Sequence, residues 1–196
     1  MFRKFDPSED ISTSTAVKSS VQRHIKQSIS DAHPALTPVL DELLPKKPPM
    51  VQYKVGPHLM LYYRGDEPVF FQQRDGPILP ALRFVHKYPG LDFTRVTVDK
   101  GAIPFIIGGA HIMCPGLTNP GAEMPADGVE QDAQGFDEPG LKKGDGVVIY
   151  AEGKEHALAV GTMKISSADV REKNKGVGVE VAHYIGDGLF QTKQIQ

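Results

Sequence analysis

The sequence predicts an α+β chain of two parts, because helical and strand patterns are both present and change character near residue 92. Up to that point, segments with helical periodicity precede and follow three segments in which apolar and polar residues alternate, as in strands. Beyond it, short strands are separated by glycines, a pattern typical of a small barrel. A length of 196 residues suits one large domain or two small ones. We therefore expect a mixed domain at residues 1–92 and a β-rich domain at 93–196.

The first domain should begin with a short edge strand in its first ten residues, followed by a helix over residues 12–32. The apolar side chains of this helix recur every four positions and form one stripe: Val17, Val21, Ile25 and Ile29. Ser and Thr at 12–14 can cap its start, and His33-Pro34 ends it. A second short helix fits residues 37–44.

Alternating sequence then predicts three strands, at 51–55, 58–63 and 69–73. Residues 79–88 are expected to form a helix. Arg83 and Lys87 lie four positions apart on its outer face.

The second domain is expected to contain mostly short strands, at 95–98, 110–114, 146–150, 156–163, 176–182 and 184–190. One or two helical turns fit residues 101–107, with Asp99 as their N-cap. Residues 121–143 have glycines, prolines and acids but no periodicity, so we expect an acidic flexible loop there.

The net charge of −2 is unevenly distributed along the chain. The stretch from 121 to 140 has six acidic residues and no basic one, and outside it both domains are mildly basic. This balance permits RNA binding without requiring it. A single cysteine excludes an internal disulfide and fits a reducing compartment. Without an apolar run of about 18 residues or a signal-peptide core, we expect a cytoplasmic protein with no membrane partner.

The stretch from Val98 to Leu117 contains the residues that most resemble a chemical site. Gly108 and Gly109 lack the lysine and hydroxyl that a phosphate loop needs. His111-x-x-Cys114 offers two metal ligands where a structural zinc site needs four, and no second pair exists. No orienting acid supports a catalytic cysteine. We therefore expect a buried structural cysteine, no cofactor, no metal and no enzymatic activity.

A binding surface is the remaining interpretation of this stretch. Gly108 and Gly109 leave the backbone bare, so another chain can approach closely and phosphate or sugar oxygens can reach N–H donors. The same glycines can instead form a plain tight turn that needs positive φ. Local chemistry alone leaves both interpretations open.

Two groups of motifs resemble known families. Residues 98–118, VDKGAIPFIIGGAHIMCPGLT, and 151–161, AEGKEHALAVG, resemble the PUA domain, an RNA-binding module. In the first half, FRKFD at 2–6, PKK at 45–47, FFQQRDGP at 70–77 and LRFVHKYP at 82–89 are similar to the malignant T-cell-amplified sequence protein family. The similarity extends over nearly the whole chain.

This resemblance implies an amino-terminal α/β-mixed domain packed on a PUA pseudo-β-barrel. It also implies a non-catalytic translation factor that binds the small ribosomal subunit together with density-regulated protein. Such a factor acts in reinitiation and post-termination recycling, including release of deacylated tRNA. An RNA-binding accessory subunit of an RNA-modification complex is the alternative, since PUA domains also occur there.

The resemblance further implies two RNA-binding surfaces. The PUA surface, expected to contact tRNA at its acceptor end, comprises Lys100, Gly108, Gly109, Ala110 and His111. The first domain would face ribosomal RNA through basic residues that we expect to be exposed: Lys46, Lys47, Arg74, Arg83 and Lys87. Each of these can instead be a solvated side chain without a specific contact. The long acidic segment departs from the family pattern, and its role stays open.

Overall fold

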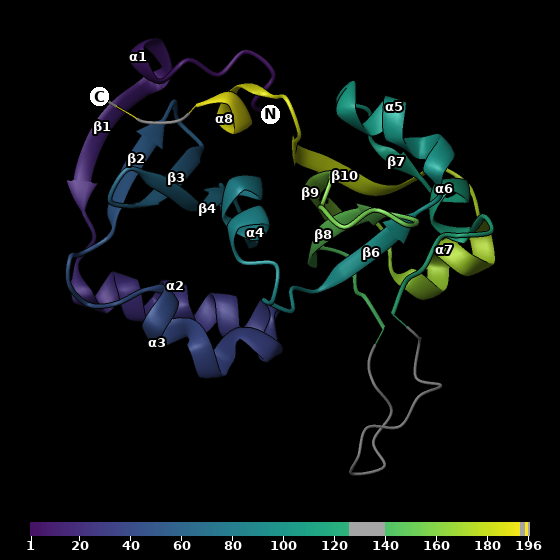
Figure 1. Ribbon diagram of the computed structural model, residues 1–196, viewed down its shortest axis with the longest axis horizontal. Helices are drawn as coiled ribbons and strands as arrows, with labels where there is room; N and C mark the ends of the chain where they lie inside the picture. The colour runs from purple at the N-terminus through teal and green to yellow at the C-terminus, as the bar shows by residue number, and fades with distance from the viewer. Residues whose placement is uncertain (126–139, 193–194, 196) are drawn as a thin grey trace. The chain divides into compact units, whose positions relative to one another are not determined.

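The computed structural model describes residues 1–125, 140–192 and 195, which form two compact units (Figure 1). The first unit contains Met1–Thr94 together with Ile185–Gln196, and the second contains Arg95–Tyr184. The expected division into 1–92 and 93–196 therefore differs from the observed units at the end of the chain. Most of the expected acidic loop at 121–143 lies outside the described residues.

The last described residues belong to the first unit because a short helix, α8 (Gly188–Gln191), packs against the start of the chain. The Gly188 backbone N–H donates to the Phe2 carbonyl, 2.8 Å away. A Cβ at position 188 would lie 2.8 Å from that oxygen, so only glycine fits there. The strand expected at 184–190 is thus wrong beyond Tyr184, because Asp187 caps α8 by accepting the Phe190 N–H.

One antiparallel sheet forms the centre of the first unit. Its strands, in spatial order, are β1 (Ile11–Ala16), β2 (Val51–Val55), β3 (Leu59–Arg64), β4 (Glu67–Gln73) and β5 (Ile78–Pro80). The three predicted strands are confirmed as β2, β3 and β4. Leu61, Phe70 and Phe71 from these strands are fully buried in the core. The helix expected at 79–88 is shorter, α4 (Leu82–Lys87), because β5 occupies its first residues.

The helix expected over 12–32 is wrong in its first third. A single turn, α1 (Pro7–Asp10), leads into β1, and the α-helix α2 (Ser19–Ala32) begins only at Ser19. In β1 the Ser and Thr residues pair with β2, from Ile11 opposite Val55 to Ala16 opposite Val51. Ser and β-branched Thr are poor helix formers, so ladder hydrogen bonds with β2 outweigh their use as caps.

The buried stripe of α2 also differs from the prediction. Val21 is exposed, and Gln22 is buried with Ile25 and Ile29. The Gln22 amide donates to the Leu44 carbonyl at 3.1 Å and to the Pro45 carbonyl at 2.9 Å. Those carbonyls follow a 3₁₀ turn, η1 (Pro34–Val39), and a short helix, α3 (Leu40–Leu43), which replace the helix expected at 37–44. Figure 1 shows α2 and α3 together on one side of the first unit.

The second unit contains a sheet that curls into a half barrel. Its spatial order is β6 (Arg95–Val98), β8 (Gly146–Ala151), β9 (Ala159–Met163), β10 (Val177–Tyr184) and β7 (Ile112–Met113). The β6–β8 pair is parallel, and the other pairs are antiparallel. Val98, Val148 and Val160 are among the fully buried side chains of its core. The expected β-rich architecture is confirmed.

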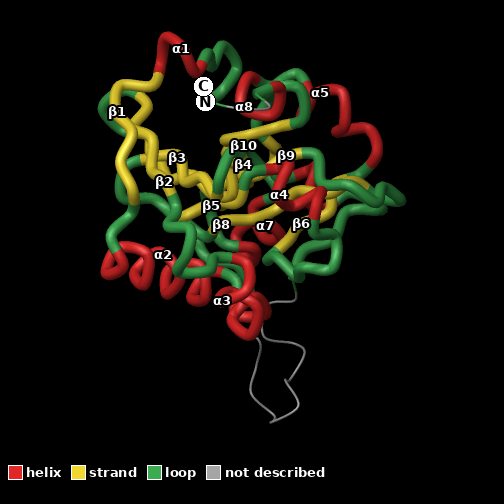
Figure 2. Tube along the Cα trace, turned by 60° about the vertical axis from the view of Figure 1, so that its left-hand side comes forward, coloured by secondary structure: helices red, strands yellow, loops and turns green. Residues whose placement is uncertain are grey.

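Short helices surround this sheet: η2 (Lys100–Ala102), α5 (Ile103–Ile107), α6 (Pro115–Thr118) and α7 (Ser167–Lys173). The helical turns expected at 101–107 are confirmed, whereas α7 was not predicted. Figure 2 shows α5 at the outer rim of the second unit, where it begins the candidate site. In the described part of the chain, no helix is both long and apolar enough to span a membrane.

Candidate nucleic-acid interface

The glycine loop, residues 108–111, connects α5 to β7. Gly109 has φ +86°, and a Cβ there would lie 2.9 Å from the Tyr184 hydroxyl oxygen. Both the backbone conformation and the neighbouring ring therefore require glycine. Gly108 has no positive φ, and it is exposed.

The backbone donors of this loop are already in use. The N–H groups of Gly108, Gly109 and Ala110 donate to the carbonyls of Pro104, Ile106 and Phe105, at 3.2, 2.9 and 3.0 Å. They complete the carboxyl end of α5. The expectation that this loop offers N–H donors to an RNA oxygen is therefore wrong for these three residues, although their small size still permits close approach.

His111 continues the loop and is exposed. Its Nδ1 accepts the Val181 backbone N–H at 3.1 Å. In the neutral ring the hydrogen must then be on Nε2, so this second nitrogen is a donor. His111 is the member of the loop with a side-chain donor for a ligand.

A groove of about 660 Å³ lies beside the loop. Its lining is mostly apolar and comes from η2, α5, the glycine loop, β7 and α6, with Phe105, Ile106, Ile112 and Met113 as its larger apolar side chains. Phe105 is 69% exposed and Met113 is 49% exposed, unusual values for large apolar side chains. Neither was predicted as a site residue, because an apolar residue within a helical or strand pattern is normally assigned to the core.

Polar groups are located at the edges of this groove. As predicted, Asp99 caps η2, accepting the Gly101 N–H at 2.7 Å on one carboxylate oxygen. Its second oxygen accepts from the Asn119 amide at 3.2 Å. Lys100 is exposed and lies beside Gly153 in the turn after β8. The groove thus combines an exposed aromatic ring with an imidazole donor and an Asp–Asn pair, while Lys100, between Asp99 and Gly101 in sequence, is not part of its lining.

Cys114 has the buried, structural role that its sequence context predicts. It is fully buried, and its thiol donates to the Lys175 carbonyl at 3.3 Å. Within the described residues, no three His, Cys, Asp or Glu side chains are grouped so that they could hold a metal ion.

The five basic residues expected on the first unit fall into two groups. Lys46, Lys47 and Arg74 are exposed. Arg74 has φ +52° in the turn after β4, where its backbone N–H donates to the His58 carbonyl at 2.7 Å. Arg83 and Lys87 instead line a pocket in the same unit.

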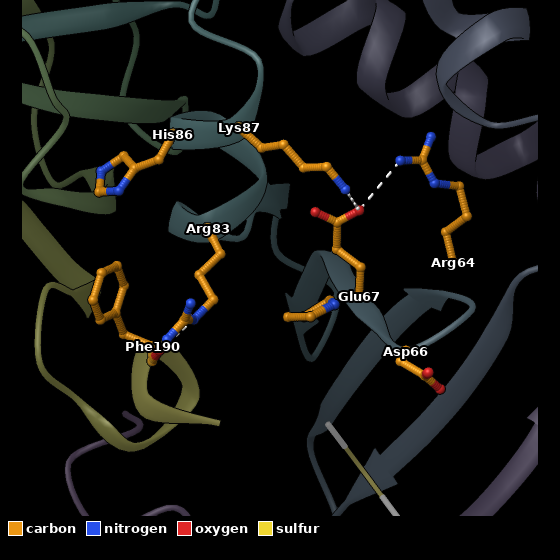
Figure 3. Close-up of a pocket in the computed structure, with 8 residues that line it drawn as sticks. Arg64, Asp66, Glu67, Arg83, His86, Lys87 and Phe190 are labelled. Carbon is orange, nitrogen blue, oxygen red and sulfur yellow. Dashed lines mark hydrogen bonds and ion pairs between the residues drawn. The ribbon is translucent and has the colours of Figure 1, made fainter. Parts of the chain in front are cut away.

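This pocket has a volume of about 750 Å³ (Figure 3). Glu67 lies at its centre, where one carboxylate oxygen accepts from Lys87 Nζ at 2.9 Å and from Arg64 at 3.2 Å. Arg64 also donates to the Tyr88 hydroxyl at 2.6 Å and to the Leu43 carbonyl at 2.7 Å. Burial alone would lower the pKa of Arg64, but its bonds to Tyr88 and Glu67 outweigh that effect and raise the pKa.

Arg83 is half-buried, which corrects the expectation that it is exposed. Its Nε donates to the Phe190 carbonyl at 2.5 Å, and its guanidinium lies 5.0 Å from the centre of the Phe190 ring. The physical cause is α8, which packs onto α4 from a distant part of the sequence. Lys87 is exposed, as expected, but paired with Glu67.

The chain matches two family models and several characterised relatives. The Pre-PUA-like domain model matches residues 5–89, and the PUA domain model matches residues 94–185. Translation machinery-associated protein 20 of Schizosaccharomyces pombe is 44% identical over 192 residues, which cover 98% of each chain. Malignant T-cell-amplified sequence 2 of Homo sapiens is 41% identical over 193 residues, again covering 98% of both.

The chain belongs to the malignant T-cell-amplified sequence family. The family resemblance drawn from the sequence motifs is thereby confirmed, with Pre-PUA and PUA domains in the predicted order. A hypothetical protein from Pyrococcus horikoshii has a similar structure, with a TM-score of 0.71 and 23% identity, over 92% of this chain and 99% of that one. A PUA-domain protein from Aeropyrum pernix gives 0.64 and 22%, over 93% and 92%. These two structures support the fold assigned to this family member.

Proposed function

We propose that this chain is a non-catalytic, cytoplasmic translation factor that binds the small ribosomal subunit together with density-regulated protein. It acts in reinitiation and in post-termination recycling, where deacylated tRNA is released. Its PUA domain contacts the acceptor end of tRNA, and its first unit contacts ribosomal RNA. The names of its relatives support a role in translation, since the fission yeast protein is named for the translation machinery.

The observation that carries the tRNA proposal is the exposure of Phe105 beside the groove. An aromatic ring that is 69% exposed offers a stacking surface for an unpaired base. RNA-binding modules use such rings on single-stranded ends, where the bases are not already stacked in a duplex. The acceptor end of tRNA is such a single-stranded end.

The surroundings of Phe105 support the same ligand. Lys100 is exposed and can neutralise a backbone phosphate. His111 offers its Nε2–H, and the edge of the groove carries Asp99 and Asn119. The backbone at Gly108 and Ala110 lets a sugar or phosphate approach without a bulky side chain between them.

The proposed ribosomal RNA surface consists mainly of Lys46, Lys47 and Arg74. All three are exposed, and within the described residues none forms a salt bridge, so each can pair with a phosphate. Arg83 and Lys87 were expected on this surface too. Their contacts with Phe190 and Glu67 give that assignment less support.

One experiment on the tRNA site compares binding of deacylated tRNA with binding of the same tRNA lacking its unpaired 3′ nucleotides. Phe105→Ala should weaken binding of the intact tRNA by about tenfold, because one stacking contact is worth about 1–3 kcal/mol. It should have little effect on the shortened tRNA. Ile107→Ala is the matched control, since Ile107 is an exposed apolar residue of the same helix outside the groove lining. Equal binding of both tRNAs would contradict the proposal.

A second experiment measures co-sedimentation with purified small ribosomal subunits, with and without density-regulated protein. Lys46→Glu combined with Lys47→Glu should release the chain. Lys18→Glu with Lys54→Glu reverses two exposed lysines of the same unit and should not. If the wild type does not sediment with the subunits, and in a cell lysate it sediments with an RNA-modification complex, the alternative of an accessory subunit is correct.

A further inference from the structure

From the geometry of the first unit, we infer that the pocket around Arg83 binds an aspartate or glutamate side chain from an extended segment of a partner protein. This inference goes beyond the RNA contacts proposed above and does not depend on them. It concerns the 750 Å³ pocket between β4, α4 and α8 in Figure 3.

Arg83 is held in position, and among the described residues it has no counter-ion. Its Nε is fixed by the Phe190 carbonyl, and its planar group lies against the Phe190 ring. Among the described residues, no carboxylate pairs with it and its two terminal nitrogens have no hydrogen-bond acceptor. A guanidinium fixed in this way has two parallel N–H groups ready for a carboxylate, the geometry that arginine binds best.

The other two cationic side chains of the pocket, Arg64 and Lys87, already have partners. Arg64 donates to the Leu43 carbonyl, the Tyr88 hydroxyl and the Glu67 carboxylate. Lys87 shares the same Glu67 oxygen. Within the part of the chain that the structure describes, Arg83 is therefore the cationic side chain of the pocket without an ion pair. An additional anion could bind to it without displacing an existing ion pair.

The net charge of the pocket lining favours a protein carboxylate over an RNA strand. Three cationic side chains and two carboxylates, Asp66 and Glu67, line the pocket, so its formal charge is +1 with His86 neutral. This balance suits a single negative charge. An RNA strand would bring successive phosphates towards two carboxylates, and like charges repel strongly at a partly buried site.

Part of the pocket lining is apolar. Pro68 and the Phe190 ring form walls beside the guanidinium. An extended peptide with an acidic residue between apolar ones would place its carboxylate on Arg83 and its neighbours on these walls. Arginine and aromatic side chains are also enriched at the energetic centres of protein interfaces.

The test starts from a displayed library of random dodecapeptides selected on the full chain. Selected peptides should share an Asp or Glu flanked by apolar residues. Replacing that acid by its amide should weaken binding, measured by fluorescence anisotropy, by about tenfold. Arg83→Gln should have a similar effect, and Arg83→Lys a smaller one because it keeps the charge but loses the fork. Arg23→Gln removes an exposed arginine of the same unit and should change nothing.

Asp66→Asn keeps the test decisive if Arg83→Gln fails to fold. Asp66 is exposed, so the variant should fold, and removing its charge should strengthen binding of the acidic peptide about twofold. The inference is overturned if the selected peptides show no preference for acids, or bind Arg83→Gln as tightly as the wild type. It is also overturned if a twelve-nucleotide uridine RNA, used as the competing probe, depends on Arg83 as strongly as the peptide does.

Discussion

The backbone N–H of Thr94 donates a hydrogen bond to Nδ1 of His33, 3.1 Å away. His33 follows α2, is only 1% exposed and packs edge-on against the Phe93 ring. Thr94 is the last residue before the second unit begins, and its hydroxyl donates to the Ala32 carbonyl as well. A neutral imidazole therefore ties the end of the first unit's main segment to the end of α2.

The first prediction is a pH dependence of stability that originates at His33. Burial lowers the pKa of His33 from 6.5 to about 4, so between these values the unfolded chain binds the proton more readily than the folded one. Stability from this group is complete above pH 6.5 and is lost as the pH falls towards 4, by about 3 kcal/mol in all. Urea unfolding at a series of pH values measures this slope. His33→Gln should remove it, and an unchanged slope would locate the titrating group elsewhere.

The second prediction concerns Gly109. Gly109→Ala should destabilise the chain by about 1–3 kcal/mol, because alanine is strained at positive φ and its Cβ would press on the Tyr184 hydroxyl. Gly144→Ala is the matched control, since Gly144 also has positive φ, +97°, but nothing within 4 Å of an added Cβ. The difference between their urea midpoints isolates the Tyr184 contact. Equal midpoints would mean that backbone conformation alone requires Gly109.

The third prediction tests the buried amide of α2. Gln22→Leu should cost about 1–3 kcal/mol, because the carbonyls of Leu44 and Pro45 would lose a donor while the site remains buried. Val21→Ala, one residue earlier and exposed, should change stability by less than about 0.5 kcal/mol. Thermal melting of both variants gives the comparison. If Val21→Ala lost more stability than Gln22→Leu, Val21 would belong to the buried face, as the helical periodicity predicts.

The fourth prediction concerns the start of α7. The Ser166 hydroxyl oxygen accepts the Asp169 backbone N–H at 3.1 Å, as an N-cap. Ser166→Ala should therefore cost about 1 kcal/mol. Ser19→Ala changes a serine at the start of α2, where no side-chain cap exists, and should be close to neutral. If chemical unfolding gives the two variants the same midpoint, the cap contributes nothing measurable.

The outcome for α7 illustrates what local patterns can and cannot predict. A serine followed three residues later by an aspartate is a helix-start signal, and it was present at Ser166 and Asp169 but was not used. By contrast, the strands β2, β3 and β4 were predictable because one face is buried and their residues alternate. At β1, Ser and Thr residues led to a wrong prediction, because they can also act as helix caps. Their pairing with β2 depends on residues some forty positions away, for example Thr15 opposite Gln52.

The candidate site, too, contains residues that could be predicted from the sequence and residues that could not. Gly109 could be recognised from sequence because its constraint is local, a positive φ at the end of a helix. Phe105 could not, because the helical pattern does not reveal that no other element covers its ring. Arg83 was expected in solvent because the residue that half-buries it, Phe190, is 107 positions away.

The hydrogen bond between Gly188 and Phe2 joins the first unit to a residue that is synthesised only after the whole second unit. A growing chain therefore finishes the second unit, Arg95–Tyr184, before α8 exists. Until then the first unit lacks the Gly188 N–H that donates to the Phe2 carbonyl and the Phe190 carbonyl that accepts from Nε of Arg83. Since domains generally fold as units in the order of their synthesis, this chain inverts the usual sequence of events: the half made first is the half completed last.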